Sequence, residues 1–444
     1  MIRLGKLEIK NVGPFEEQEF DFHFDKEKDH PDIHIFTGAN GTGKTTILQS
    51  LANVLNPNAK RHLINNFYKR FQVQDNEVKV LIFIKKKNQF LGVIKSTYDH
   101  EDTLMPMQYR VIKKLKDHSL NKEFTENVFF DTKLAITHQT FKFAAFGYSG
   151  YRLINSTVIK NTEESNYNPL HLALEFDKKT EENNNISNWI MNRYSKAAIE
   201  ETHGNKELAD KYRSALNCLM ESIETLTNGE FTFTIKTNPL QVVTKYHGNE
   251  IEFDVLPDGL RSILSWMGDL LMRLDQIPWE NNEIPVNEQD IILFLDEIEV
   301  HLHPKWQYRI LPLTKAIFPN AQIFITTHSP FILNSIDDAK IYQLETEKGI
   351  SKLKKVSLSN TGDSYQYIYE EILGVTKRFG VETENDLKRF NEIDSEIVQG
   401  NFEREAEFKE VIASLADEGK EVTSLISSKL FRLKRVVGKD YLPA

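Results

Sequence analysis

The chain has 444 residues, a formal net charge of −10, 40% hydrophobic residues and a single cysteine. The negative charge argues against a protein that coats nucleic acid by bulk attraction, because that mode needs surplus lysine and arginine. The single cysteine, Cys218, excludes an internal disulfide framework and a cysteine-rich zinc site, which favours a reducing compartment. No uninterrupted apolar stretch approaches the roughly 20 residues that span a bilayer. We therefore expect a cytoplasmic protein that is neither secreted nor membrane-spanning.

The sequence pattern in the first half of the chain predicts strands on both sides of a glycine-rich loop. Residues 2–10 alternate in polarity like a strand, and FEEQEFDFHF suggests a second strand that pairs with them. The IHIF run at 33–36 predicts a third strand, and the apolar spacing of TTILQSLANVL predicts a helix after the loop. Residues 78–115 are typical of an antiparallel meander, and 141–152 resume the apolar pattern. The polar segment between 161 and 185 predicts a surface loop.

The second half alternates between helices and strands. Residues 186–228 predict a short helical pair with a break near His203, too short for a long coiled-coil arm. A further helix is expected over 259–277, and the chain after about 360 is expected to be mainly helical. The predicted strands are FTFTIKT, LQVVTKYHGNEIEFDVL, IILFLDEI and AQIFITTHS, the last two typical of a parallel sheet covered on both faces.

GANGTGKT, residues 38–45, matches the phosphate-loop pattern between a predicted strand and a predicted helix. Gly38, Gly41 and Gly43 allow the backbone to curl so that its N–H groups point at phosphate oxygens. Lys44 would reach the β and γ phosphates, and the Thr45 hydroxyl would hold Mg²⁺. The alternative, a glycine-rich turn with a solvated lysine, is disfavoured by the flanking elements. The expected nucleotide contacts are Gly38, Ala39, Asn40, Gly41, Thr42, Gly43, Lys44, Thr45 and Thr46.

An acidic pair follows the apolar run IILFL, where ligand crevices of α/β sheets lie. Asp296 would reach Mg²⁺, and Glu297 would orient and deprotonate the attacking water. His328, in THSP after another apolar run, would donate to the γ-phosphate, although a lone histidine there is more often structural. His301 and His303 could complete a metal site with the acidic pair, but zinc would need further ligands, so we favour a structural or communicating role for them.

Together, the N-terminal strands, GANGTGKT, FLDEIEVHLHP and ITTHSPFIL resemble the ABC-type ATPase heads of the RecF and structural-maintenance-of-chromosomes group. More closely, they resemble the Septu and retron-associated AAA ATPases of bacterial anti-phage systems. The resemblance covers roughly residues 1–345 and also SYQYIYEEILGV with the charged helices after it. It implies an α/β fold, an ABC-type P-loop ATPase head with a mixed sheet and a parallel core, a short helical hairpin insertion and a helical C-terminal region.

The same resemblance implies an ATPase that uses ATP and Mg²⁺, with Lys44, Glu297 and His328 as catalytic residues. It also implies a homo-oligomer built on head-to-head dimers, in which two heads enclose two ATP molecules. The expected divisions are an N-terminal lobe over 1–185, the helical insertion over 186–228, a C-terminal lobe over 229–345 and a C-terminal region over 346–444 that could dock a partner.

The signature loop departs from the family pattern. LPDGLRSILSW, residues 256–266, stands where ABC heads carry LSGG. Pro257 takes the place of the serine that meets the γ-phosphate bound by the partner subunit, and Asp258 replaces the first glycine. Asp258 and the retained Gly259 remain expected contacts of that nucleotide. Losing one such donor costs about 10² to 10³ in rate, so we expect slow hydrolysis. Gln139 is a weak candidate for the Q-loop.

Two functions fit this pattern. One is a sensor or regulatory scaffold of anti-phage defence that controls a separately encoded nuclease effector. The other is a RecF-like DNA-repair ATPase that binds DNA when ATP is bound. Three basic clusters, at 85–87, 113–116 and 432–435, could contact nucleic acid or simply be solvated faces. Asp337 and Asp338 lack the D-x-D spacing of a Toprim nuclease, so we expect no nuclease site in this chain. A self-contained metal nuclease that uses the histidines is the least favoured alternative.

Overall fold

The computed structural model describes residues 2–22, 31–55, 76–84, 89–98, 108–111, 140–150, 154–156, 159, 168–176, 183–375 and 377–441. The chain forms two compact units, Met1–Ile368 and Tyr369–Ala444. Among the described helices, none is both long and apolar enough to cross a membrane.

A six-stranded sheet forms the centre of the first unit, in the order β14-β13-β3-β12-β11-β7. Its strands are β3 (Asp32–Gly38), β7 (Ala144–Tyr148), β11 (Ile291–Leu295), β12 (Ala321–Thr326), β13 (Lys340–Glu347) and β14 (Ile350–Leu358). All neighbours pair in parallel except β14, which pairs antiparallel with β13. Every residue of β11 and β12 is buried, as parallel strands covered on both faces require.

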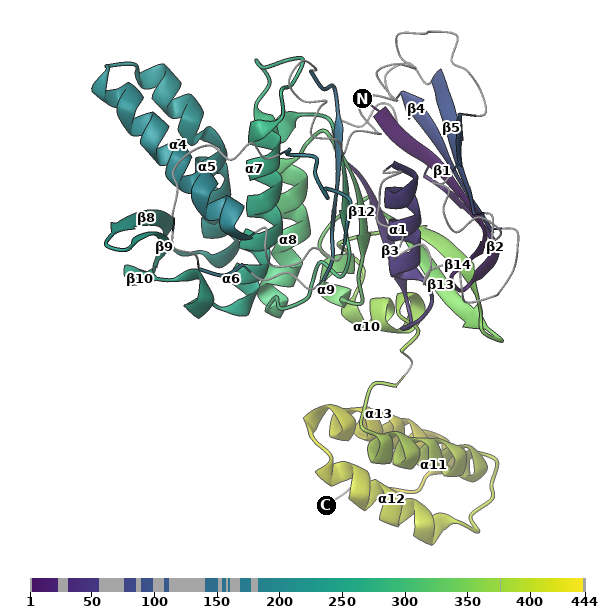
Figure 1. The fold of residues 1–444 in the computed structure, drawn as a ribbon. Coiled ribbons are helices and arrows are strands. Elements are labelled where there is room, and N and C mark those ends of the chain that lie inside the picture. The colour runs from purple at the N-terminus through teal and green to yellow at the C-terminus, as the bar shows by residue number, and fades with distance from the viewer. Residues whose placement is uncertain are drawn as a thin grey trace. The chain divides into compact units, whose positions relative to one another are not determined.

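An antiparallel sheet, in the order β2-β1-β4-β5-β6, packs on the other side of helix α1 (Lys44–Leu55) (Figure 1). Its strands are β1 (Ile2–Val12), β2 (Phe15–Asp21), β4 (Asn76–Ile84), β5 (Gln89–Tyr98) and β6 (Gln108–Val111). Aromatic rings fill the core between the layers, with Phe22 and Phe324 in edge contact at 5.0 Å between centroids. Helix α1 is therefore enclosed by both sheets, which fixes the phosphate loop at its start.

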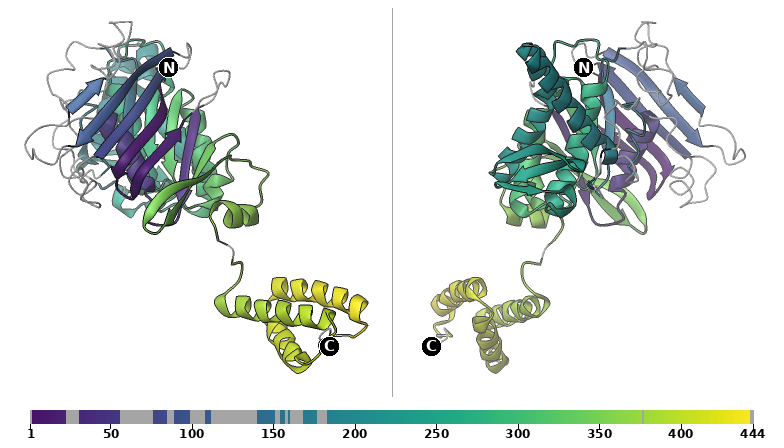
Figure 2. Two further views of the ribbon diagram at one scale, coloured as in Figure 1. Left: turned by 90° about the vertical axis from the view of Figure 1, so that its right-hand side faces the viewer. Right: turned by 60° about the vertical axis from the view of Figure 1, so that its left-hand side comes forward.

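Helices cover the opposite face of the central sheet, as the views in Figures 1 and 2 show. They are α4 (Asn183–Thr202), α5 (Lys206–Thr227), α6 (Asp258–Ile263), α7 (Asp269–Gln276) and α8 (Pro304–Ile317). A small antiparallel sheet of β8 (Phe231–Thr237), β9 (Leu240–Tyr246) and β10 (Asn249–Ile251) accompanies them. The α/β class with a mixed sheet and a parallel core, predicted from the sequence, is confirmed.

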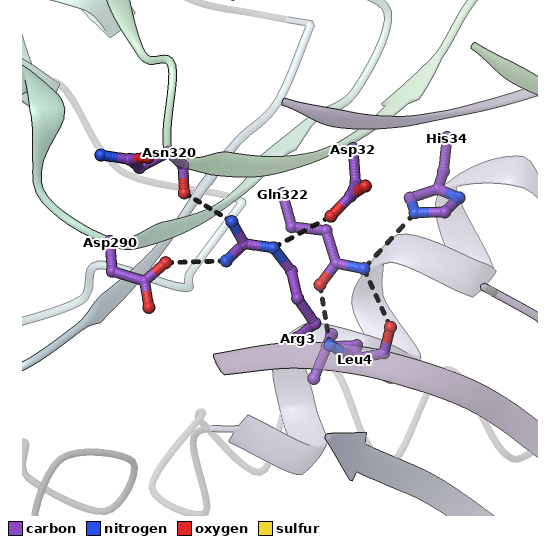
Figure 3. Close-up of polar contacts among 7 residues, drawn as sticks. All are labelled: Arg3, Leu4, Asp32, His34, Asp290, Asn320 and Gln322. Atoms are coloured by element: carbon purple, nitrogen blue, oxygen red, sulfur yellow. Dashed lines mark hydrogen bonds and ion pairs between the residues drawn. The ribbon is translucent and has the colours of Figure 1, made fainter. Parts of the chain in front are cut away.

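Arg3 fastens the first strand to the amino end of the central sheet (Figure 3). Its side chain is only 1% exposed. Its Nε donates to Asp32 Oδ2 at 3.0 Å and its Nη1 to Asp290 Oδ1 at 2.7 Å. Its Nη2 donates to the carbonyl oxygen of Asn320 at 2.8 Å. These partners begin or precede β3, β11 and β12, so one guanidinium joins three parallel strands to β1.

Gln322 of β12 provides a second link to β1 (Figure 3). Its Oε1 accepts from the N–H of Leu4 at 2.7 Å, and its Nε2 donates to the carbonyl oxygen of Leu4 at 2.9 Å. The adjacent His34 is fully buried, stacks on Phe324 at 4.7 Å and pairs with the Tyr342 hydroxyl at 3.2 Å. Burial lowers the pKa of His34 well below its ordinary value, with Lys340 and Arg3 acting in the same direction.

Short elements complete the first unit. Helix α9 (Pro330–Leu333) follows the THSP segment, and α10 (Tyr365–Tyr367) begins SYQYIYEEILGV. Phe331 and Tyr365 meet edge to face at 5.1 Å between ring centroids. Asp337 accepts hydrogen bonds from both the N–H and the hydroxyl of Thr361, so its carboxylate holds a loop in place.

The second unit is a bundle of α11 (Val381–Val398), α12 (Glu405–Asp417) and α13 (Lys420–Val437). Residues at spacings of three and four form its core, among them Phe390, Phe408 and Leu433. Arg432 pairs with Asp394 at 2.7 Å, and Lys434 pairs with Asp440. Two members of this basic cluster are therefore engaged in local ion pairs, whereas the clusters at 85–87 and 113–116 lie outside the described residues.

Three sequence expectations differ from the structure. The boundary expected between residues 345 and 346 falls inside β13, which pairs with β14, so the central sheet continues to Leu358. Part of the expected surface loop 161–185 is core, because Leu174 and Phe176 are buried and the ring of Phe176 packs at Gly147. The single helix expected over 259–277 contains a π-helical turn at Leu264–Gly268.

Candidate nucleotide-binding site

The phosphate loop joins the end of β3 to the start of α1. Gly43 has φ +89°, and a Cβ there would lie 2.5 Å from Cε2 of Phe15, so the β1–β2 turn packs directly against the loop. The Nζ of Lys44 donates to the carbonyl oxygens of Gly38 and Ala39, each at 3.1 Å. The Thr42 hydroxyl donates to Ala39 O at 2.9 Å. The protein itself thus holds the loop in a closed curve, with N–H groups at the start of α1 available for an anion.

The environment of Lys44 combines burial with nearby acids. Burial lowers the pKa of the Lys44 ammonium, while the charges of Glu297, Asp296 and Glu299 act in the opposite direction. Lys44 as a whole residue is 6% exposed. A cation held this far from water is poised to interact strongly with an anionic ligand, because screening is weak there.

Asp296 stands at the carboxyl end of β11 and is bonded to two hydroxyls. Thr45 Oγ1 donates to Oδ1 and Oδ2 of Asp296 at 3.0 and 2.9 Å, and Thr326 Oγ1 donates to Oδ1 at 2.6 Å. The contact between Thr45 and Asp296 spans 251 positions of sequence. A hydroxyl and a carboxylate beside a phosphate loop are hard oxygen donors of the type that Mg²⁺ prefers, so the residues present fit that ion.

Glu297 has an unusual backbone conformation. Its φ is +46°, a left-handed value that costs a non-glycine residue about 1–3 kcal/mol and is concentrated at functional sites. Its N–H donates to Thr326 Oγ1 at 2.8 Å. Its side chain lies beside Gly150, where an added Cβ would come within 3.0 Å of Glu297 Oε2. Thr326 therefore fixes both members of the acidic pair.

His328 follows β12 and is half-buried. Burial lowers the pKa of its imidazole, Lys44 lowers it further, and Asp296 acts in the opposite direction. Its Nε2 atom is buried and has no hydrogen-bond partner among the described residues. A neutral imidazole with an unpartnered buried nitrogen, within the electrostatic reach of Lys44 and Asp296, fits a position that donates to a phosphate.

The signature segment lies in the helical layer, on the other side of the central sheet from α1 (Figure 1). Asp258 is the first residue of α6, is exposed, and pairs with Arg261 at 3.4 Å. Gly259 is buried; a Cβ there would lie 2.9 Å from both the carbonyl oxygen of His301 and a ring atom of Trp306. These residues are therefore not part of the phosphate loop's own surroundings, and their expected contact with a nucleotide on a second subunit stays a prediction.

The two histidines after the acidic pair have structural surroundings. His303 is the N-cap of α8, and its Nδ1 accepts from Lys305 N at 3.2 Å. His301 is exposed in the preceding turn with φ +66°. Over the described part of the chain, no group of three or more His, Cys, Asp or Glu side chains is arranged to hold a metal ion. Gln139, the Q-loop candidate, lies outside the described residues.

Three contributors to this site were not predicted from the sequence. Thr326 and Glu299 bond to the predicted site residues, and Gly150 provides space for Glu297. A polar residue at the end of an otherwise apolar strand could have indicated Thr326. No spacing rule pairs Glu299 with His328, because the contact joins two loops.

Comparisons with known proteins indicate the family to which the chain belongs. A family model described as an AAA domain matches residues 6–232, and one described as "AAA domain, putative AbiEii toxin, Type IV TA system" matches residues 243–334. The chain is 22% identical over 384 residues to the Septu protein PtuA of Bacillus thuringiensis, covering 84% of this chain and 85% of that protein. It is 22% identical over 436 residues to the Retron Ec83 probable ATPase of Escherichia coli, covering 85% and 77%.

Among solved structures, the SmcHead bound to the C-winged helix domain of ScpA aligns with a TM-score of 0.47 and 13% identity, covering 80% of this chain and 98% of that one. The AAA-domain model alone spans more than half of the sequence. The chain therefore belongs to the AAA-domain ATPases, and its relatives include the Septu protein PtuA and the ATPases of retrons.

Proposed function

We propose that the chain binds ATP with Mg²⁺ at residues 38–46 and hydrolyses it. The observation that carries this proposal is the meeting of Thr45, Asp296 and Thr326 beside the closed phosphate loop. Lys44 would neutralise phosphate charge, and Thr45 and Asp296 would hold Mg²⁺, which when bound draws charge away from the phosphates during transfer.

Glu297 would receive the proton of the attacking water, and His328 would donate from Nε2 to the γ-phosphate. Two heads would close over two nucleotides, with Asp258 and Gly259 facing the ATP of the partner subunit. Pro257 offers no hydroxyl or N–H donor to that phosphate, and Asp258 brings negative charge. Hydrolysis would therefore be slow, and the ATP-bound dimer long-lived.

The physiological role that fits such a slow switch is a sensor or regulatory scaffold of anti-phage defence. The support for it is the relation to the Septu and retron proteins over more than three quarters of each. The effector would be a nuclease encoded separately, and nucleic acid would be contacted by that effector or directly by the dimer.

A phage-challenge experiment tests this role together with the chemistry. Cells would carry the chain with the gene beside it, either as wild type or with Glu297→Gln, which retains size but removes the base. Protection that depends on Glu297, together with co-purification of the neighbouring gene product, is expected. Equal protection by both forms, or no stable complex, would count against the scaffold role. ATP hydrolysis by the purified chain is then measured separately.

The RecF-like alternative makes a distinct prediction. It requires the isolated chain to bind DNA when ATP is present, with an affinity that falls steeply with salt. Arg432 and Lys434 are already paired with acids, which weakens one of the clusters on which such binding would depend. Tight, ATP-dependent DNA binding by the chain alone would favour repair over defence.

A further inference from the structure

Two side-chain links join the turn after the acidic pair to the loop that carries His328. Glu299 Oε1 accepts from the backbone N–H of His328 at 2.6 Å. Further on, Ser329 Oγ donates to Gln307 Oε1 at 2.7 Å, and Gln307 Nε2 donates to Leu302 O at 2.8 Å. The turn and the His328 loop are therefore joined at two places, and Glu299 makes the link closest to the imidazole.

A buried glutamate is an energetically unfavourable residue for a purely structural link, and Glu299 is one. Its Oε2 is buried without a hydrogen-bond partner among the described residues. Burial raises the pKa of its carboxyl and the charge of Glu297 acts in the same direction, against the opposing effects of the His328 N–H, its own N–H and the Thr327 hydroxyl. A buried polar atom without a partner is destabilising, and an apolar side chain of similar size would avoid that cost. Its presence is therefore better explained by what its other oxygen holds.

That oxygen holds the backbone of His328. The Nε2 of the imidazole has no partner in the described part of the protein, so the side chain is not anchored at that end. Orientation of the ring then depends on the backbone that carries it, and the Glu299 bond fixes that backbone at the residue itself. A donor that is held in place before the ligand arrives contributes more than one that must be ordered on binding.

We infer that Glu299 is a positioning residue of the ATPase site, which aims His328 at the γ-phosphate by holding its backbone N–H. This inference rests on the proposed function, because it assumes that a nucleotide occupies the phosphate loop. It also connects the site to the signature helix. The turn that carries Glu299 ends near His301, whose carbonyl oxygen packs at Gly259 of α6.

Nucleotide affinity measured with a γ-phosphate present and absent tests the inference. Dissociation constants for Mg²⁺–ATP and Mg²⁺–ADP would be measured in a Glu297→Gln background, which preserves ATP during the measurement. Glu299→Met removes the acceptor at similar volume, whereas Glu299→Gln retains an acceptor oxygen. Glu224→Met is the matched control, because Glu224 accepts the backbone N–H of Phe231 at 2.9 Å between α5 and β8.

Glu299→Met should weaken ATP binding about tenfold while changing ADP binding less than twofold, since the lost bond acts through a γ-phosphate contact. Glu299→Gln should restore most of the preference for ATP, and Glu224→Met should leave it unchanged. His328→Ala should cause the same loss as Glu299→Met. The double variant Glu299→Met, His328→Ala should be no weaker than His328→Ala alone, because both changes remove one contact.

Other outcomes overturn the inference in distinguishable ways. Additive losses in the double variant, or equal losses for ATP and ADP, would assign Glu299 a merely structural role. If His328→Ala lowers the preference for ATP but Glu299→Met does not, the positioning role fails while the proposed function stands. If the background protein binds neither nucleotide, the proposed function fails and the inference fails with it.

Discussion

The amino end of the central sheet satisfies its buried charges, whereas the carboxyl end leaves polar atoms and backbone in costly states. At the amino end, Arg3 bonds to Asp32, Asp290 and Asn320. At the carboxyl end, Glu297 has a left-handed backbone and His328 Nε2 lacks a partner among the described residues. The contrast separates residues that hold the fold together from residues whose costly states the proposed nucleotide site would explain.

Replacing Arg3 with Met should give the largest loss of stability. It would leave Asp32 and Asp290 buried without their cation, which costs about 3–5 kcal/mol. Urea unfolding followed by tryptophan fluorescence measures the loss, because all 4 tryptophans belong to the first unit. Lys352→Met, which breaks an exposed pair with Glu347, should cost less than about 1 kcal/mol. Equal losses of stability for Arg3→Met and Lys352→Met would show that Arg3 has no special role in holding the fold together.

Replacing Lys44 with Met should have the opposite effect: a large loss of ATP hydrolysis without a large loss of stability. ATP hydrolysis should fall by about 10² to 10³, because a charged donor to the phosphates is lost. The free energy of unfolding should change little, since the loss of the bonds to Gly38 O and Ala39 O is offset by no longer burying an ammonium. Phosphate release and urea unfolding are the two measurements. Lys245→Met, on an exposed position of β9, should change neither, and a large stability loss for Lys44→Met would contradict the contrast.

Strand β12 allows the comparison to be made within one element. Gln322 near its start bonds to Leu4, and Thr326 at its end bonds to Asp296 and Glu297. Gln322→Leu should cost about 1–3 kcal/mol of stability and leave turnover unchanged. Thr326→Val should lower turnover about tenfold, with a smaller loss of stability. If both variants lose stability and turnover in the same proportion, the two ends of the sheet are not functionally distinct.

The smallest expected effect is the pH dependence contributed by His34. Its pKa in the folded protein lies well below the ordinary value of 6.5, because burial disfavours the cation. The unfolded chain therefore binds the extra proton first, and stability is lost as pH falls from about 6.5 towards the folded pKa, by at most about 1.4 kcal/mol per pH unit. Urea midpoints at pH 7.5 and 5.5 should differ less in His34→Gln than in wild type. Identical slopes would mean that His34 does not cause the dependence.

The parts of the site that the sequence predicted share one property: their chemistry is encoded within a few consecutive residues. GANGTGKT determines a strand, a turn and a helix start, and FLDE places two acids after an apolar strand. The structure brings Thr45 next to Asp296 as such motifs require. The roles of these residues in catalysis stay predictions.

The parts that could not be predicted depend on contacts between distant segments. The bond between Glu299 and His328 joins two loops whose approach is set by the parallel register of β11 and β12. In the sequence, Arg3 is one of several charges in an alternating strand. In the structure, its bonds to Asp32 and Asp290 make it a core residue. The boundary near residue 345 was misplaced because a polar antiparallel edge strand, ISKLKKVSL, alternates only weakly.

The network of Arg3 also has a consequence for synthesis on the ribosome. Arg3 is translated 317 positions before its acceptor on Asn320. At roughly 5–20 residues per second, the first strand must wait roughly 15 to 60 s before its last partner emerges. Contacts of such long sequence separation also form late and slowly. The link between β1 and the start of β12 is thus among the last contacts to form, and in a nascent chain that ends before β12 the Arg3 guanidinium lacks its acceptor on Asn320.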